Sequence, residues 1–119
     1  MKVDEKVGYY LQKGLKTAGG SHDSRPSEPL INAFLFVLDD FLADRLTAEQ
    51  LSSISQALYR FDYLSQNLIS ESPDDFAALD LAMALAKAKP SQKKQIMIQL
   101  RHYYQSKQAQ LRRLRAMDN

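Results

Sequence analysis

Cysteine is absent from this 119-residue sequence, which excludes disulfides, thiolate metal sites and a cysteine nucleophile. Long apolar runs are absent too, and none approaches the roughly 20 residues that a membrane-spanning helix needs. The opening residues MKVDEKVGYY carry charges where a signal peptide would be apolar. These absences lead us to expect a cytoplasmic protein with no membrane partner.

β-branched residues are sparse, and no stretch of useful length alternates apolar and polar residues as a strand would. Leucine, alanine, glutamine and lysine dominate instead, and all four favour helix. A hydrophobic share of 45% suits a folded core in a chain of this length. We therefore predict an all-α fold in which residues 1–119 form a single helical domain. Its form is a five-helix antiparallel bundle or an orthogonal helical array with a long C-terminal helix.

Turn and capping residues set the boundaries of the predicted helices. Ser27, Ser72 and Ser91 precede helical patterns as N-caps, and the motif TAEQ at 47–50 is typical of a capping box. The stretch 17–28 is rich in turn residues and predicts a flexible loop. The five predicted helices cover about 4–17, 28–44, 48–69, 73–89 and 91–117. The helix over 28–44 carries a wide apolar arc, so we expect it to be the central core helix.

Charge is distributed unevenly along the chain. Residues 27–80 carry ten acidic and two basic residues, whereas residues 81–117 carry nine basic residues and no acidic one. Three interpretations of the basic part stay open. It is solvated or paired with the acidic region, it binds a protein or a second copy of the chain, or it binds nucleic acid.

The predicted long basic amphipathic helix over 91–117 has one apolar side and a neighbouring basic stripe. At 100° per residue, Ile96, Leu100, Tyr103 and Leu114 cluster on the apolar side, with Leu111 at its edge. A basic stripe on a helix can follow phosphates, and an aromatic residue beside it can stack on a base. The candidate nucleic-acid contacts are Lys94, Arg101, Tyr104, Arg112 and Arg115.

Several apolar and aromatic residues are candidates for an interface with a partner or a second copy. Tyr59 and Tyr63 lie one helical turn apart, and tyrosine is enriched at interfaces. Leu81 and Leu85, with Ala77, Ala78 and Ala88, form a second apolar stripe on the helix over 73–89. A helix that is apolar on two sides is buried on two sides. We expect the 91–117 helix to outrun the others, so that Leu111 and Leu114 also need a partner.

The sequence contains no convincing catalytic or metal-binding arrangement. The adjacent residues SHDS at 21–24 cannot converge as a triad requires, because neighbours on a loop point in different directions. Asp40 and Asp44 share a helix face, but no histidine stands at ligand spacing from them. The glycines of AGGSHDS lack the lysine and the preceding strand of a phosphate loop. We expect no catalytic residue, metal, cofactor or small-molecule substrate.

These observations favour a non-enzymatic helical protein-binding module. It would act as a small cytoplasmic regulator, adaptor or inhibitor, through a protein partner or as a homodimer. The alternative is a nucleic-acid-binding protein that uses the basic face of the C-terminal helix.

Overall fold

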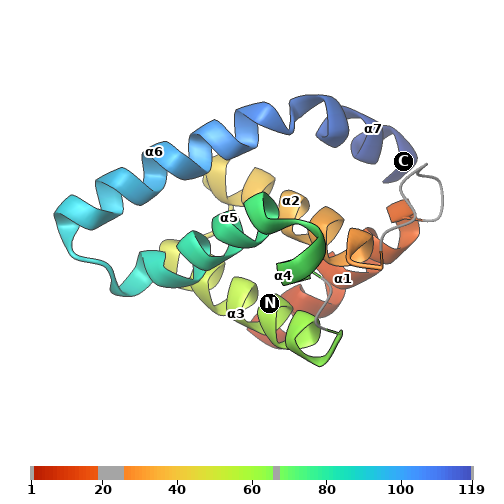
Figure 1. Ribbon diagram of the computed structural model, residues 1–119, viewed down its shortest axis with the longest axis horizontal. Helices are drawn as coiled ribbons and strands as arrows, with labels where there is room; N and C mark the ends of the chain where they lie inside the picture. The colour runs from red at the N-terminus through yellow and green to blue at the C-terminus, as the bar shows by residue number, and fades with distance from the viewer. Residues whose placement is uncertain (1, 19–25, 66–67, 119) are drawn as a thin grey trace.

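The computed structural model describes residues 2–18, 26–65 and 68–118, and these stretches contain helices and connecting turns but no strand (Figure 1). This confirms the predicted all-helical class. The domain is compact, with principal extents of 40 × 29 × 27 Å. In chain order the helices are α1 (Val3–Ala18), α2 (Glu28–Leu42), α3 (Ala48–Ser65), α4 (Leu68–Glu71), α5 (Pro73–Ala84), the 3-10 helix η1 (Leu85–Lys87), α6 (Pro90–Ser106) and α7 (Gln108–Asp118).

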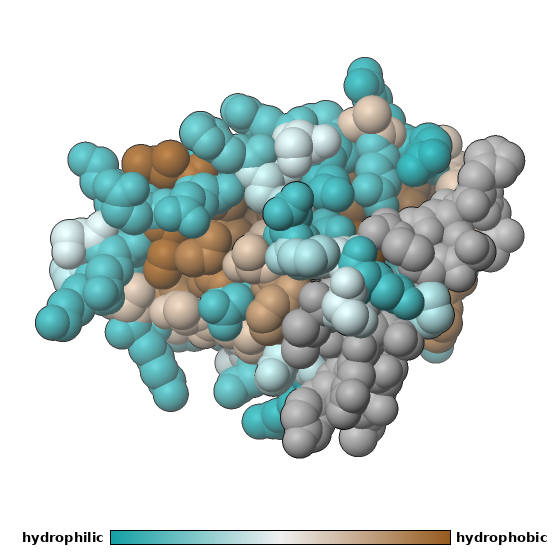
Figure 2. All heavy atoms as spheres, in the orientation of Figure 1, coloured by the Kyte–Doolittle hydropathy of each residue, from teal (hydrophilic) through white to brown (hydrophobic). Residues whose placement is uncertain are grey.

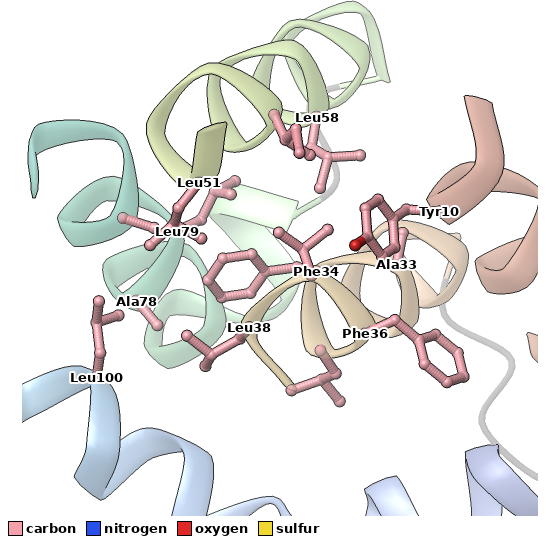
Figure 3. Packing of buried hydrophobic residues seen from close by; sticks show 14 of the residues in the cluster. Tyr10, Ala33, Phe34, Phe36, Leu38, Leu51, Leu58, Ala78, Leu79 and Leu100 are labelled. Atoms are coloured by element: carbon pink, nitrogen blue, oxygen red, sulfur yellow. The ribbon is translucent and has the colours of Figure 1, made fainter. Parts of the chain in front are cut away.

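Helix α2 is the centre of the fold. Every residue from 31 to 38 is buried, because α1, α3, α6 and α7 all contact this helix. Phe34 and Phe36 point to opposite sides of α2, so one helix supplies apolar side chains to two parts of the core (Figure 3). The buried amide of Asn32 is satisfied on both sides, since it donates to Thr17 Oγ1 at 3.2 Å and accepts from Gln110 Nε2 at 3.2 Å.

Helix α1 buries a different face from the one that leucine spacing suggests. The four-residue spacing of Val7, Leu11 and Leu15 predicts one apolar stripe, but Leu15 is 63% exposed. The buried residues are Val7, Tyr10, Gly14 and Thr17. Gly14 decides the orientation, because a Cβ atom at this position would lie 2.1 Å from the carbonyl oxygen of Pro29. Helices α1 and α2 contact each other at Gly14, and this contact leaves Leu15 on the side of α1 that faces solvent.

The predicted helix starts are partly confirmed. The capping box at 47–50 forms, with the Gln50 amide donating to Thr47 Oγ1 at 3.1 Å and the Thr47 amide donating to Gln50 Oε1 at 2.9 Å. Ser27 precedes α2 as predicted, but its hydroxyl donates to Glu71 Oε2 at 2.9 Å instead of accepting from the helix. Ser72 likewise makes no side-chain capping bond to α5.

The start of α6 also differs from the prediction. Ser91 lies inside the helix, and the N-cap is Lys89, whose amide donates to Gln92 Oε1 at 3.2 Å. The helix begins here because Pro90 occupies the first turn, where its missing N–H needs no partner.

The predicted helix over 48–69 is shorter, since α3 ends at Ser65 and α4 follows at Leu68. Phe61, which fits the apolar period of α3, is 49% exposed. The predicted loop over 17–28 is shorter too, because Thr17 belongs to α1 and Glu28 to α2. The central residues of this loop, including the SHDS sequence, lie outside the described residues.

The single helix predicted over 91–117 is divided at Lys107, which separates α6 from α7. At this turn the Lys107 amide donates to the carbonyl of Tyr104 at 3.1 Å. The Lys107 ammonium lies 3.1 Å from the buried carboxylate of Asp75, which also accepts a hydrogen bond from Tyr103. The chain end therefore does not project. It turns back across α2 towards α1 (Figure 1).

Candidate docking groove beside helix α6

An open groove lies between the end of α5 with η1 on one side and the start of α6 on the other. Its volume is about 840 Å³. Figure 2 shows hydrophobic residues gathered between α5 and α6 and surrounded by hydrophilic ones. The buried side chain of Ile96 forms part of the lining. The full lining is Ala84, Lys87, Ala88, Ser91, Gln92, Gln95 and Ile96.

A serine from α3 interrupts the helix that borders this groove. The Ser52 hydroxyl donates to the carbonyl of Ala82 at 2.8 Å and accepts from the amide of Ala86 at 3.0 Å. These two backbone groups would bond to each other in a continuous α-helix, so the hydroxyl is inserted into the hydrogen-bond ladder. The helix predicted over 73–89 therefore changes to the 3-10 turn η1, and the chain then leads into α6 across the end of the groove.

The second apolar stripe predicted for the 73–89 helix divides into two parts. Leu85 and Ala78 are buried in the core of the chain itself, so Leu85 is not available to a partner. Leu81 is only half-buried, and it lies one turn before Ala84 on the same side of α5. Leu81 packs against the core but keeps part of its side chain exposed, so it remains an interface candidate near the groove.

The charges beside the groove are mainly positive. Lys87 lines the groove, and Lys89 and Lys94 lie exposed in the turn and the first turns of α6. Asp80 is the acidic residue one turn before Ala84, on the exposed ridge of α5. Lys87 also lines a second, smaller hollow of about 490 Å³, where it lies with Glu49 of α3.

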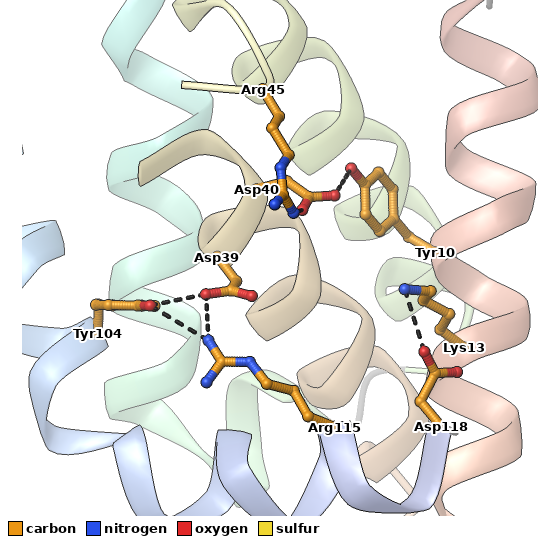
Figure 4. A network of polar contacts seen from close by, with 8 residues as sticks. All are labelled: Tyr10, Lys13, Asp39, Asp40, Arg45, Tyr104, Arg115 and Asp118. Atoms are coloured by element: carbon orange, nitrogen blue, oxygen red, sulfur yellow. Dashed lines mark hydrogen bonds and ion pairs between the residues drawn. The ribbon is translucent and has the colours of Figure 1, made fainter. Parts of the chain in front are cut away.

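Two of the predicted nucleic-acid contacts are used within the fold. The Tyr104 hydroxyl donates to Asp39 Oδ1 at 2.7 Å, and the Arg115 guanidinium lies 2.5 Å from the same oxygen (Figure 4). The hydrogen bond to Asp39 raises the pKa of Arg115, and burial opposes this with a smaller effect. These two side chains connect α6 and α7 to α2, and their role as nucleic-acid contacts stays a prediction.

The other three candidate contacts are exposed. Lys94, Arg101 and Arg112 make no ion pair with any part of the chain that the structure describes. Ile98 lies between Lys94 and Arg101 on one side of α6 and is 39% exposed. This outer face of α6 is therefore basic with one apolar residue, and it is separate from the groove.

The remaining interface candidates have three different surroundings. Leu111 and Leu114 are buried in the core, because α7 turns back over α1 and α2, so neither requires a partner. Tyr59 is half-buried against Phe76, with 5.7 Å between ring centroids. The side chain of Tyr63 lies outside the described residues.

Only part of the groove could be predicted from the sequence. Ala88 belongs to the predicted second apolar stripe, and Ile96 to the predicted apolar side of the 91–117 helix, but neither pattern predicts a groove. Nothing in the sequence indicated that Gln92 and Gln95 line a groove, because polar residues in an α-helix are usually solvated. Only the separation of α6 from α5 makes these residues the rim of a hollow.

The described part of the chain holds no group of three or more His, Asp or Glu residues that could bind a metal ion. None of its helices is long and apolar enough to cross a membrane. No family model matches the chain, and no curated protein or solved structure matches it either.

Proposed function

We propose that this protein is a non-enzymatic helical protein-binding module, a small regulator, adaptor or inhibitor, and that its partner docks in the groove beside α6. The groove is the observation that supports this proposal. Its lining combines the apolar side chains of Ala84, Ala88 and Ile96 with hydrogen-bonding groups at the edge, as protein interfaces do. Leu81, half-buried one turn before Ala84, is a further apolar residue near this end of α5.

The experiment compares proteins retained from a cell lysate of the source organism by immobilised wild-type protein and by variants with a filled groove. Ala84→Trp fills the groove from the η1 side, and Gln95→Trp fills it from α6; residue 84 and residue 95 are both exposed. Matched controls are Ala109→Trp on α7 and Gln12→Trp on α1, at exposed positions far along the chain from the lining residues.

We expect at least one protein to be retained by the wild type and both controls and to be lost from both groove variants. Thermal unfolding of all four variants checks that the folds are equivalent. If every retained protein behaves the same on groove variants and controls, the groove is not the docking site.

Nucleic-acid binding is the second candidate, and the exposed Lys94, Arg101 and Arg112 are the observation in its favour. We expect a mobility-shift assay with a generic duplex to show little binding at physiological salt, because Arg115 and Tyr104 are held by Asp39. A robust shift that the double variant Arg101→Glu, Arg112→Glu abolishes would reverse this ranking.

A further inference from the structure

We propose that the groove binds the apolar face of an amphipathic helix of a partner protein whose flanking residues are acidic. This inference rests on the proposed function and specifies the chemistry of the partner. It follows from three properties of the groove, which are its apolar lining, its small side chains and its surrounding charge.

The apolar lining selects an apolar contact surface. Ile96, Ala84 and Ala88 line the groove and give it an apolar floor and wall. Covering such a surface with another apolar surface is favourable because it removes both from water. A phosphate backbone offers no matching apolar surface, which disfavours nucleic acid as the occupant of the groove itself.

The shape of the groove favours a helix as the docked segment of the partner. The groove runs between two helical segments, and the side chains of Ala84 and Ala88 on one wall are small enough to allow a close approach. Along α6 the lining runs from Ser91 to Ile96, about 7.5 Å at 1.5 Å per residue, which matches about one and a half turns of a docked helix. Amphipathic helices bind such grooves through anchors at i, i+3, i+4 and i+7.

The positive charge around the groove favours a partner helix with acidic residues beside its apolar face. Lys87 lines the groove, Lys89 lies at the turn that closes its end, and no acidic residue occurs between positions 81 and 117. Opposite charges across an interface steer association and exclude partners of the wrong sign. Asp80 is the nearby acidic residue on α5, and it would weaken an acidic partner slightly.

The test uses two synthetic fluorescein-labelled helical peptides and fluorescence anisotropy. Both peptides carry leucine at i, i+3, i+4 and i+7; one has glutamate on the flanking positions and the other has lysine. We expect the glutamate peptide to bind at least about tenfold more tightly at low salt, and this preference to shrink as salt rises. Ala84→Trp should remove binding of the glutamate peptide, and Ala109→Trp should not.

Charge reversal near the groove gives a second, independent measurement. The double variant Lys87→Glu, Lys89→Glu should weaken the glutamate peptide about tenfold, since two exposed charge pairs become repulsive. The matched double variant Arg112→Glu, Arg113→Glu makes the same change on exposed positions of α7 and should alter binding by less than about twofold. Asp80→Lys should strengthen binding.

The outcomes separate this inference from the proposed function. If both peptides bind equally, or if the two double variants have equal effects, the inference of an acidic partner is wrong. This result would not affect groove-dependent capture from the lysate. Loss of groove-dependent capture overturns the proposed function, whatever the peptides do. Groove-dependent self-association in sedimentation velocity, with no peptide binding, would identify a second copy of the chain as the occupant and would overturn the inference.

Discussion

Helices α1 and α7 both pack against the central helix α2, but they are held there by different forces. Helix α1 approaches so closely at Gly14 that no side chain fits between it and Pro29. Helix α7 buries Leu111 and Leu114 and is otherwise held by polar contacts, among them Arg115 with Asp39 at 2.5 Å. Asp118 adds an ion pair with Lys13 of α1 at 3.2 Å (Figure 4).

This difference determines how each helix should respond to change. Close packing is sensitive to added volume and insensitive to salt, because dispersion contacts depend on fit. Ion pairs at partly exposed positions are sensitive to charge removal and to screening. We therefore expect α7 to open locally before α1 does, since its contacts with the rest of the fold are fewer and more polar.

The largest effect is expected where volume is added to the α1–α2 contact. Gly14→Ala should lower the free energy of unfolding by about 3 kcal/mol, because the new methyl group meets a backbone oxygen that cannot move aside. Gly8→Ala is the matched control, since a Cβ there has nothing within 4 Å, and it should stabilise by roughly 0.5–1 kcal/mol. Denaturant unfolding measures both. Similar effects of the two substitutions would show that the close approach does not hold α1 in place.

A smaller effect is expected at the polar contacts of α7. Asp39→Ala removes the shared partner of Tyr104 and Arg115 and should cost about 1–2 kcal/mol, discounted because Arg115 is partly exposed. Hydrogen exchange should become faster in α7 and stay unchanged in α1. The cost should also fall in high salt, which screens the pair in the wild type.

The control for this change is Asp80→Ala, which removes an exposed carboxylate from α5. It should alter stability by less than about 0.5 kcal/mol. If exchange accelerates equally in α1 and α7 after Asp39→Ala, the two helices open as one unit and the contrast between them fails.

The smallest effect concerns a polar contact inside the α1–α2 face. Burial raises the pKa of the Tyr10 hydroxyl above its ordinary value near 10, and the hydrogen bond to Asp40 at 2.5 Å adds to this. The folded state therefore holds this proton more tightly than the unfolded chain does. The resulting stability is present in full below pH 10 and is lost as the pH rises towards the folded pKa.

The advantage of the wild type over Tyr10→Phe should accordingly shrink by about 1 kcal/mol between pH 8 and pH 11. Urea titrations of both proteins across this range give the difference directly, because other titrating groups are common to both. A difference that stays constant up to pH 11 would mean that Tyr10 ionises alike in the folded and unfolded chains.

Much of the fold could be predicted from local patterns. The apolar character of α2 predicted its central place, and the TAEQ motif predicted the start of α3, because both depend on neighbours a few residues away. The patterns failed where distant segments meet. Leu15 follows the leucine spacing of α1 yet is exposed, because the contact of Gly14 with Pro29 sets the orientation of the whole helix.

The candidate site was less accessible to sequence reasoning than the fold. The second apolar stripe included Ala88, but the hydrogen bonds of Ser52 of α3 that interrupt the helix beside the groove could not be predicted. Ser52 lies thirty residues before Ala82 in the chain, so no local sequence pattern predicts this hydrogen bond. The pairing of Tyr104 and Arg115 with Asp39 was not predictable for the same reason, since Asp39 lies far away in the sequence, on α2.

The sequence by itself therefore determined the helical class, the central helix and the uneven distribution of charge. These follow from residue propensities, apolar periodicity and composition, which are properties of short segments or of the whole chain. The tertiary structure alone decided that the C-terminal helix bends at Lys107, which of its basic residues are paired, and where the groove lies. Those features depend on contacts between residues far apart in the chain, such as Lys107 with Asp75, and no local pattern encodes such pairings.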